Sequence, residues 1–249
     1  MASDAITARA AGRQPMHRPV NRTAERVFYT GMALVLCACV YIGFAPTYFR
    51  AGMLQAPLPS PILHFHGAAF TLWMLLFTVQ ATLISAKRVT WHRALGTVAF
   101  CLPPIMIVLG VIAAVDALRR GVMIGPLDPS VSFAIPLIGI IAFTIVIFAS
   151  WRARRRPDAH KRLILLATIG ITGAAFGRFP WDRIGLPPAA GAVTGVGSLI
   201  VLFLIFELAT LRRIHRSTLW AAPLVLATTA FAVPIGMTSA WHAFAALLK

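Results

Sequence analysis

Acidic residues are scarce in this sequence, with seven Asp and Glu against 23 Lys and Arg in 249 residues and a formal net charge of +16. Charged residues of both signs make up only 12% of the chain, whereas 59% of its residues are hydrophobic. A soluble domain usually has about 25% charged residues, so the composition excludes an ordinary soluble protein. It predicts an all-α, polytopic transmembrane bundle.

The few cysteines and the absence of catalytic motifs exclude further classes of protein. Cys37, Cys39 and Cys101 lie within apolar runs and form no CxxC pair, so we expect small buried side chains. The sequence has no Walker loop, nucleophile elbow, HExxH motif or pair of acidic residues on one helix. These absences argue against an ATPase, a serine hydrolase and a metalloprotease. A membrane redox protein is the enzymatic class that stays open.

The first 26 residues have no apolar core, so they are not a secretory signal peptide. They are rich in Arg and nearly free of acidic residues. This composition suits a transit peptide or, more simply, a basic and disordered cytoplasmic tail. We predict a tail over residues 1–26 and a transmembrane domain over residues 27–249.

Seven apolar runs of a length that crosses a bilayer predict seven membrane-spanning helices. They lie near residues 28–48, 61–85, 93–116, 131–151, 161–179, 190–211 and 218–240. With the N-terminus in the cytoplasm, 17 of the 23 Lys and Arg fall on the inner side, in the tail and in loops 86–93, 152–162 and 212–217. This excess predicts a cytoplasmic N-terminus and an outer C-terminus. We therefore expect the lipid bilayer, and no nucleic acid, as its partner.

Polar and aromatic side chains follow one face of the second predicted span, LHFHGAAFTLWMLLFTVQ at 63–80. Counting from His66 in steps of three and four, this face carries Phe70, Trp73, Phe77 and Gln80. We expect it to face the bundle interior, because Gln and His are costly against lipid. The stripe is either a packed interior seam or the wall of a cavity for a cofactor, a quinone or a substrate.

Three predicted inner helix starts share a His followed by a basic residue, at 92–96 (HRALG), 160–164 (HKRLI) and 215–219 (HRSTL). Histidines at such positions are often simply interfacial. Alternatively, His92 and His160 lie at comparable depth and are candidate ligands of a haem b iron from opposite faces. Arg93, Lys161 and Arg162 would then bind the haem propionates.

The outer side offers fewer candidate ligands. His66 and His64 are candidates for a metal or haem site, but they lie about 200° apart around an ordinary helix. An HxH pair alone is weak evidence for copper or zinc. Arg178, in GRFPWDRIG, either anchors the helix at the interface or binds an anionic group near the outer mouth. Glu207 lies close to Arg212 in sequence, and this spacing predicts an ion pair at the inner interface.

Several separated motifs between about residues 60 and 220 resemble a group of bacterial multi-helix membrane proteins of unknown function. They are LHFHGAAFTLWMLLFTVQATLI, HRALG, PDAHKRLILLATI, GRFPW and IHRSTLW. The resemblance implies a small, multi-pass helical bundle in the bacterial inner (plasma) membrane. A looser likeness to four-histidine membrane proteins of haem and cytochrome oxidase assembly implies haem or copper handling.

Three classes of function remain. The first is a redox or haem-handling protein that uses His92 and His160 as ligands, with His66, Trp73 and Gln80 around a second cavity. The second is a structural or assembly subunit, with a membrane protein or a second copy of the chain as partner. The third is a small-molecule transporter without a cofactor, in which Arg178 selects anions. A bound chromophore, a dry packed interior and a cavity that reaches one surface distinguish the three.

Overall fold

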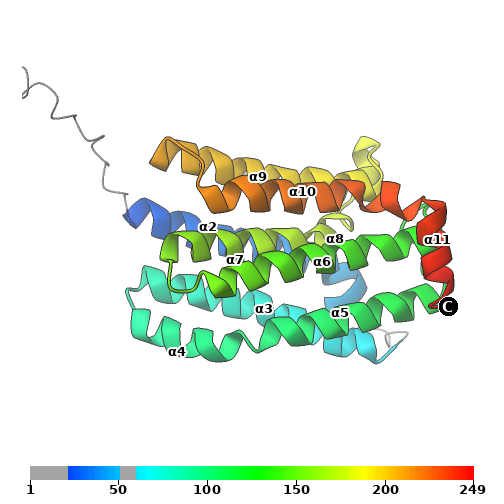
Figure 1. Cartoon of the computed structure of the whole chain (residues 1–249), viewed down its shortest axis with the longest axis horizontal. Helices are drawn as coiled ribbons and strands as arrows, with labels where there is room; N and C mark the ends of the chain where they lie inside the picture. Colours follow the sequence, from blue (N-terminus) through cyan, green and yellow to red (C-terminus); the bar gives the residue numbers. More distant parts are fainter. Residues whose placement is uncertain (1–21, 51–59) are drawn as a thin grey trace, which may run out of the picture.

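The computed structural model describes residues 22–50 and 60–249. Within these two ranges every long element is a helix and no strand forms, so the prediction of an all-α fold is confirmed. The chain order is α2 (Arg22–Phe44), η2 (Ala45–Phe49), α3 (Ile62–Ser85), α4 (Val89–Ala99), α5 (Leu102–Arg119), α6 (Pro129–Arg152), α7 (Pro157–Ile171), α8 (Gly173–Phe176), η4 (Trp181–Ile184), α9 (Pro188–Leu211), α10 (Arg216–Gly236) and α11 (Ser239–Ala246). The long helices lie side by side along an elongated bundle (Figure 1).

Six helical segments in the described ranges are long and apolar enough to cross a membrane. They are Arg22–Phe49, Ile62–Ser85, Val89–Arg119, Pro129–Arg152, Pro188–Leu211 and Arg216–Gly236. Each matches one predicted span within a few residues. The first begins at Arg22, inside the predicted tail, and the rest of that tail lies outside the described residues. These six segments fit an integral, multi-pass membrane protein.

The predicted fifth span, 161–179, has a different form from the other six. A turn at Thr172 divides it into α7, of 15 residues, and α8, of four. An uninterrupted crossing needs about 20 residues, so neither piece reaches that length. The segment nevertheless runs through the bundle centre, where Leu165, Leu166 and Ile169 are fully buried. The count of seven spans therefore stays a prediction.

The third candidate span is broken at Phe100 and Cys101, between α4 and α5. Pro103 and Pro104 lack the backbone N–H groups that would continue the α-helical ladder from the preceding turn. The N–H of Cys101 instead bonds to the carbonyl of Val98 at 3.0 Å, one residue closer than in an α-helix. As a result α4 departs from the direction of α5 (Figure 1), packs mainly on α3 and has no buried residue in the described structure.

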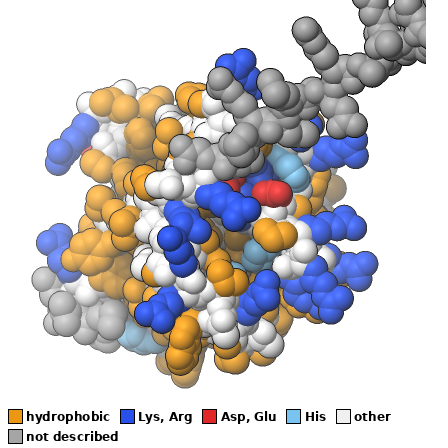
Figure 2. Space-filling model, turned by 90° about the vertical axis from the view of Figure 1, so that its left-hand side faces the viewer, with side chains coloured by type: hydrophobic (Ala, Val, Ile, Leu, Met, Phe, Trp, Pro, Cys, Tyr) orange, Lys and Arg blue, Asp and Glu red, His pale blue; other side chains and the backbone are white. Residues whose placement is uncertain are grey.

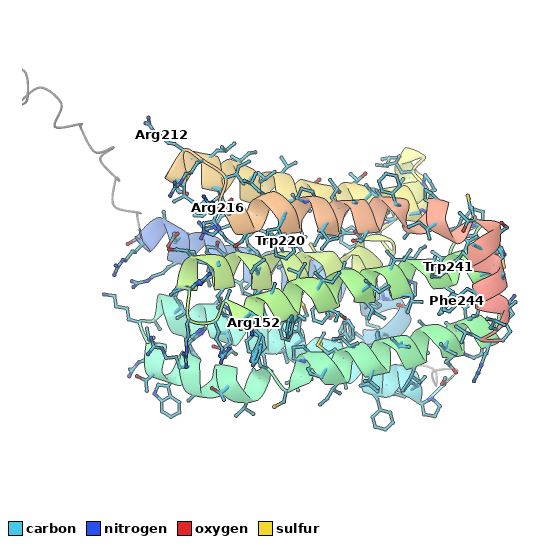
Figure 3. All side chains as sticks on the ribbon, viewed as in Figure 1. Arg152, Arg212, Arg216, Trp220, Trp241 and Phe244 are labelled. Carbon is cyan, nitrogen blue, oxygen red and sulfur yellow. The ribbon has the colours of Figure 1, made fainter. Side chains whose placement is uncertain are left out.

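One end of the bundle, here called the basic end, carries most of the charge. It comprises the starts of α2, α4, α7 and α10 and the ends of α3, α6 and α9 (Figure 1). Figure 2 shows this end with many Lys and Arg side chains around it and acidic and His side chains among them. In Figure 3, Arg152, Arg212 and Arg216 lie at this end, and Trp241 and Phe244 of α11 lie at the other. The loops predicted to be cytoplasmic therefore share one end of the bundle.

Small residues let aromatic rings lie directly on α9. A Cβ atom on Gly195 would overlap the ring of Phe176, and one on Gly191 would overlap Trp181. These contacts join the segment after α7 to α9, in line with the small-residue spacing of that span. The three cysteines are free, but Cys37 and Cys39 are only half-buried and Cys101 is exposed. The expectation of buried cysteines is therefore wrong for Cys101.

A buried ion pair fixes α7 against α9. Arg162 Nε donates to Glu207 Oε1, and the two residues are 2% and 1% exposed. Glu207 Oε2 also accepts from the backbone N–H of His215 at 3.2 Å, and an Arg162 NH group donates to the carbonyl of Asp158 at 2.6 Å. The predicted pairing of Glu207 with Arg212 is wrong, because a helix distant in sequence supplies the partner.

Candidate functional site

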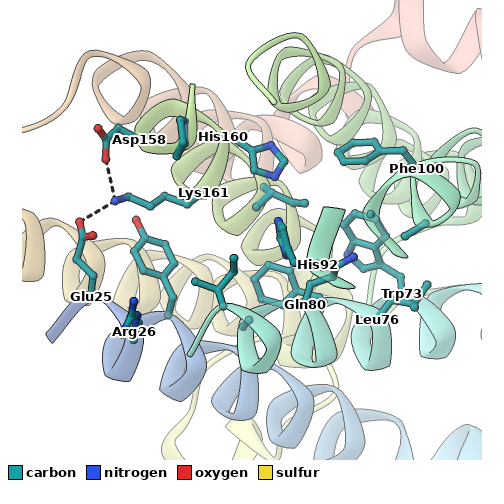
Figure 4. A pocket seen from close by; sticks show the side chains of 18 of the residues that line it. Glu25, Arg26, Trp73, Leu76, Gln80, His92, Phe100, Asp158, His160 and Lys161 are labelled. Carbon is teal, nitrogen blue, oxygen red and sulfur yellow. Dashed lines mark hydrogen bonds and ion pairs between the residues drawn. The ribbon is translucent and has the colours of Figure 1, made fainter. Parts of the chain in front are cut away.

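A cavity of about 540 Å³ opens at the basic end between α2, α3, α4 and α7 (Figure 4). Its lining consists of Arg22, Glu25, Arg26 and Tyr29 from α2; Trp73, Leu76, Phe77, Gln80, Ala81 and Ile84 from α3; His92, Gly96, Ala99 and Phe100 from α4 and its end; and Pro157, Asp158, His160, Lys161 and Ile164 from α7. Arg22, Pro157 and Asp158 are exposed, so the cavity reaches the surface.

The cavity exists because the third span is bent. The proline pair after the break turns α4 away from α7, so the two helices face each other across a space instead of packing together. A helix without this break would continue in the direction of α5 and stay packed along the bundle. The sequence run with two adjacent prolines therefore produces the space, and the side chains of the surrounding helices give it its chemistry.

His92 is fixed on the α4 side of the cavity by Gln80. With the Gln80 amide oriented to satisfy all its contacts, its nitrogen donates to His92 Nδ1 at 2.5 Å and its oxygen accepts from the Gly96 N–H at 2.9 Å. In this orientation a Cβ on Gly96 would lie 3.3 Å from the Gln80 amide oxygen, so glycine leaves room for this contact. Because His92 Nδ1 accepts, neutral His92 carries its proton on Nε2.

His160 is fixed on the opposite side by Ser150 of α6. Its Nδ1 lies 3.1 Å from the Ser150 carbonyl oxygen and 3.1 Å from the Ser150 hydroxyl. The hydroxyl donates to the His160 carbonyl at 3.4 Å, so both Ser150 oxygens are acceptors for the Nδ1–H group. Neutral His160 therefore has an unprotonated Nε2. The two imidazoles lie close enough to interact electrostatically and face each other in Figure 4.

The floor of the cavity is aromatic. Trp73 is 4% exposed, donates from Nε1 to the Thr168 hydroxyl at 3.3 Å and meets Phe143 edge to face. Phe77 is also buried, and the ring of Phe100 lies 6.1 Å from that of His160. Rings held by packing and hydrogen bonds form a rigid apolar surface against which a flat molecule can lie.

Polar groups surround the mouth of the cavity. Lys161 Nζ contacts Glu25 Oε1 of α2 at 2.7 Å and Asp158 Oδ1 at 2.9 Å (Figure 4). The hydrogen bond from Lys161 lowers the pKa of the Asp158 carboxyl, which lies outside the six candidate spans, and keeps it ionised. The Tyr29 hydroxyl is buried in the cavity wall and has no hydrogen-bond partner within the described ranges.

The structure divides the predicted stripe of α3 between two places. Trp73, Phe77 and Gln80 line the cavity together with His92 and His160, although these residues are far apart in the sequence. Phe70 does not line it and instead lies against the ring of His66, with ring centres 4.3 Å apart. Of the stripe expected to be an interior seam or a cavity wall, only the residues of the inner half of the helix line this cavity.

The outer histidines lie at the opposite end of the bundle from His92 and His160. Both belong to one uninterrupted helix, and His64 is exposed whereas His66 is half-buried, so they do not share a face. Arg178 lies at the same end, with its guanidinium 4.4 Å from the ring centre of Phe44 and an NH group donating to the Ala174 carbonyl. None of His64, His66 and Arg178 lines the cavity that contains Trp73 and Gln80.

The basic residues predicted to bind propionates have other positions. Arg93 is exposed and does not line the cavity, and Arg162 is buried in its pair with Glu207. Only Lys161 lines the cavity, where Glu25 and Asp158 already balance its charge. The predicted anion site on these three residues is therefore not assembled in the structure.

The donor set does not fit a bis-histidine haem or another metal site. His160 has the tautomer of a metal ligand, but His92 presents Nε2–H, which is a donor and no ligand. Ligation would require the Gln80 amide to turn and place its nitrogen against the Gly96 N–H. No group of three or more His, Cys, Asp or Glu able to hold a metal ion occurs in residues 22–50 and 60–249. Binding of haem, copper or zinc is not supported.

Sequence reasoning missed Tyr29, Ser150 and Glu25. Glu25 lies just before the first apolar run, and Tyr29 lies at its start. Ser150 is a single small polar residue at the end of another apolar run. A helical-face count from the first span would have grouped Glu25 and Tyr29, which are four residues apart. Nothing in the sequence pairs Ser150 with His160 except the short loop between α6 and α7.

Comparisons with protein-family models, with curated proteins and with solved structures find no match to this chain. The site is therefore interpreted from its own geometry.

Proposed function

We propose that this protein binds a lipid-soluble small molecule within the membrane, with the cavity between α2, α3, α4 and α7 as the binding site. One observation carries the proposal: a cavity of about 540 Å³ with a mainly apolar lining and a few convergent polar groups opens at the basic end. Ligand sites in proteins typically have about 300–1,000 Å³ and this kind of lining.

The cavity favours small-molecule binding or transport without a cofactor over the other two classes. A purely structural subunit needs close packing, since protein interiors contain few voids larger than a water molecule. Here two imidazoles, each fixed through Nδ1 by a neighbouring helix, are directed into an open space instead of packing against each other. Polar groups held in this way orient a ligand.

The membrane arrangement belongs to the same proposal. The basic end faces the cytoplasm of a bacterium, the α7–α8 segment forms the fifth of seven spans, and the C-terminus lies outside. The concentration of Lys and Arg at that end supports this orientation. The cavity mouth then lies at the level of the lipid head groups, where an amphiphile arrives with its polar part foremost.

The test compares two tryptophan substitutions on α4. Ala99 lines the cavity, so Ala99→Trp fills it, whereas Ala94 is exposed and outside the lining, so Ala94→Trp is the matched control. Protein purified in mild detergent is extracted with organic solvent, and the extracted lipophiles are quantified by mass spectrometry. We expect one compound enriched with the wild type and Ala94→Trp and depleted about 10-fold or more with Ala99→Trp. Equal content in all three proteins would refute the proposal.

An absorption spectrum of the same samples, oxidised and then dithionite-reduced, tests the haem alternative. A sharp reduced α-band that disappears in His92→Ala and in His160→Ala would assign the cavity to haem and contradict the proposal. Colourless protein with an enriched lipophile supports it.

A further inference from the structure

The two cavity imidazoles differ in what they offer a ligand, because their Nδ1 atoms have opposite partners. Gln80 donates to His92 Nδ1 at 2.5 Å, whereas His160 Nδ1–H donates to the Ser150 carbonyl at 3.1 Å. His92 thus presents an N–H donor through Nε2, and His160 presents an acceptor through Nε2. One group that accepts and donates at the same time satisfies both.

We infer that the ligand is a quinol, an aromatic ring with hydroxyl groups, and that one hydroxyl bridges His92 and His160. This inference rests on the proposed function and adds the chemical class of the ligand. A hydroxyl oxygen accepts from His92 Nε2–H and its proton is donated to His160 Nε2. A quinone carbonyl only accepts, so it leaves the His160 nitrogen without a partner.

Two features beside the imidazoles point to a flat ring with a second oxygen. Trp73, Phe77 and Phe100 provide aromatic surface beside the imidazole pair. Aromatic faces and edges favour a planar aromatic partner over a branched alkyl group. Tyr29 lines the same cavity, and its buried hydroxyl lacks a hydrogen-bond partner within the described ranges.

Gln80 acts as a positioning residue in this scheme. Its amide holds His92 in the Nε2–H tautomer because its nitrogen faces His92 Nδ1 and its oxygen is engaged by the Gly96 N–H. A carboxylate in its place accepts from His92 Nδ1–H and reverses the tautomer. Gln80→Glu therefore turns His92 Nε2 into an acceptor, so a quinone loses its hydrogen bond from His92, and the bridging hydroxyl of a quinol keeps only its bond to His160.

The experiment measures the affinities of four probes for detergent-purified protein under argon: decylubiquinol, its dimethyl ether, decylubiquinone and 1-decanol. An unpartnered buried nitrogen costs enough to weaken binding by about 10-fold. We therefore expect the quinol to bind about 10-fold more tightly than the quinone, with the dimethyl ether no better than the quinone and decanol weakest.

Variants then separate the roles of the two histidines. His160→Phe should weaken quinol binding about 10-fold and leave quinone binding unchanged, so that the preference disappears. Gln80→Glu should weaken the binding of both quinol and quinone about 10-fold, because each loses its hydrogen bond from His92, and should leave the preference unchanged. Each variant is used only if it elutes from size exclusion as the wild type does, and His160→Phe provides a change of selectivity that a general loss of packing would not produce.

The possible results distinguish the inference from the proposed function. Equal binding of quinol, ether and quinone, blocked by Ala99→Trp, would overturn the inference and keep the cavity as a lipophile site. Absence of binding of all four probes, together with no enriched lipophile in the extracts, would overturn both. A quinol preference that survives in His160→Phe would also overturn the inference.

Discussion

Breaking the buried pair between Arg162 and Glu207 should be among the most destabilising single changes in the bundle. Both side chains are almost completely excluded from solvent, and each makes a further hydrogen bond to backbone, at Asp158 and His215. Removing one member of such a pair leaves an uncompensated buried charge, which costs about 3–5 kcal/mol. Glu207→Gln and Arg162→Gln should each lower the free energy of unfolding by about this amount.

Replacing both residues separates the cost of an orphan charge from the worth of the pair. Arg162→Met combined with Glu207→Leu removes both charges, so its cost should be far smaller than that of either single change, or even favourable. The control is Arg120→Gln, because the Arg120–Asp116 pair at the other end has side chains 29% and 26% exposed. Breaking that partly exposed pair should cost about 0.3–0.5 kcal/mol.

Unfolding in mixed detergent micelles, followed by circular dichroism at increasing denaturing-detergent fraction, measures these differences. The pair lies next to Lys161 and two residues from His160 in α7. Single changes should therefore also weaken ligand binding, and the apolar double replacement should restore part of it. If the single variants are as stable as Arg120→Gln, or the double variant is less stable than both, the assignment of a buried charge pair is refuted.

Three further changes test the features that shape the bundle and its cavity. Replacing Pro103 and Pro104 together by Ala should restore backbone hydrogen bonds, straighten α4 onto α5 and reduce the lipophile recovered in organic extracts; unchanged recovery would contradict the role of the bend. Gly195→Ala should destabilise by about 1–3 kcal/mol because its Cβ meets Phe176, whereas Gly139→Ala, with open space around its Cβ, should be neutral or stabilising in the same unfolding assay. Burial and, to a lesser extent, the nearby Arg162 lower the pKa of His215, and the charged groups of Glu207, Asp158 and Lys161 also lie near its imidazole. The Nδ1 atom of His215 accepts a capping hydrogen bond from the Ser217 N–H. Because the folded-state pKa lies below the unfolded one, the contribution of His215 is complete above the unfolded pKa of about 6.5 and is lost as the pH falls below it. His215→Asn, which keeps a cap, should flatten this loss, and an identical pH profile would contradict the assignment.

The course of the helices could be predicted from hydropathy, but their breaks could not. The helix over Pro129–Arg152 agrees with its predicted span, 131–151, because a long apolar run leaves a membrane chain no other hydrogen-bonded form. The segment 161–179 is also largely apolar, yet it divides at Thr172, where Gly170 and Gly173 weaken the helix. Packing against α6 and α10 holds α7 in the centre, and α8 packs against α9 and α2. Such packing is not visible in a hydropathy pattern.

The residues of the cavity could likewise be predicted only in part. Helical periodicity correctly grouped Trp73, Phe77 and Gln80, because residues at these spacings share a face. It could not show that His66 and Phe70 on the same stripe turn to each other at the far end. The charge partners were the least predictable, since Glu207 contacts Arg162 across 45 residues of sequence. Closeness in the sequence had instead predicted Arg212 as the partner of Glu207.

The occupancy of the cavity decides whether this protein binds a small molecule there. Native mass spectrometry of the protein released from micelles would compare the wild type with Ala99→Trp and Ala94→Trp. We expect a single bound small molecule on the wild type and on Ala94→Trp, and bare protein for Ala99→Trp, because of the two substituted residues only Ala99 lines the cavity. The same adduct on all three proteins would contradict this expectation. The absence of an adduct from all three proteins, even after one of the four probes has been added, would contradict it as well.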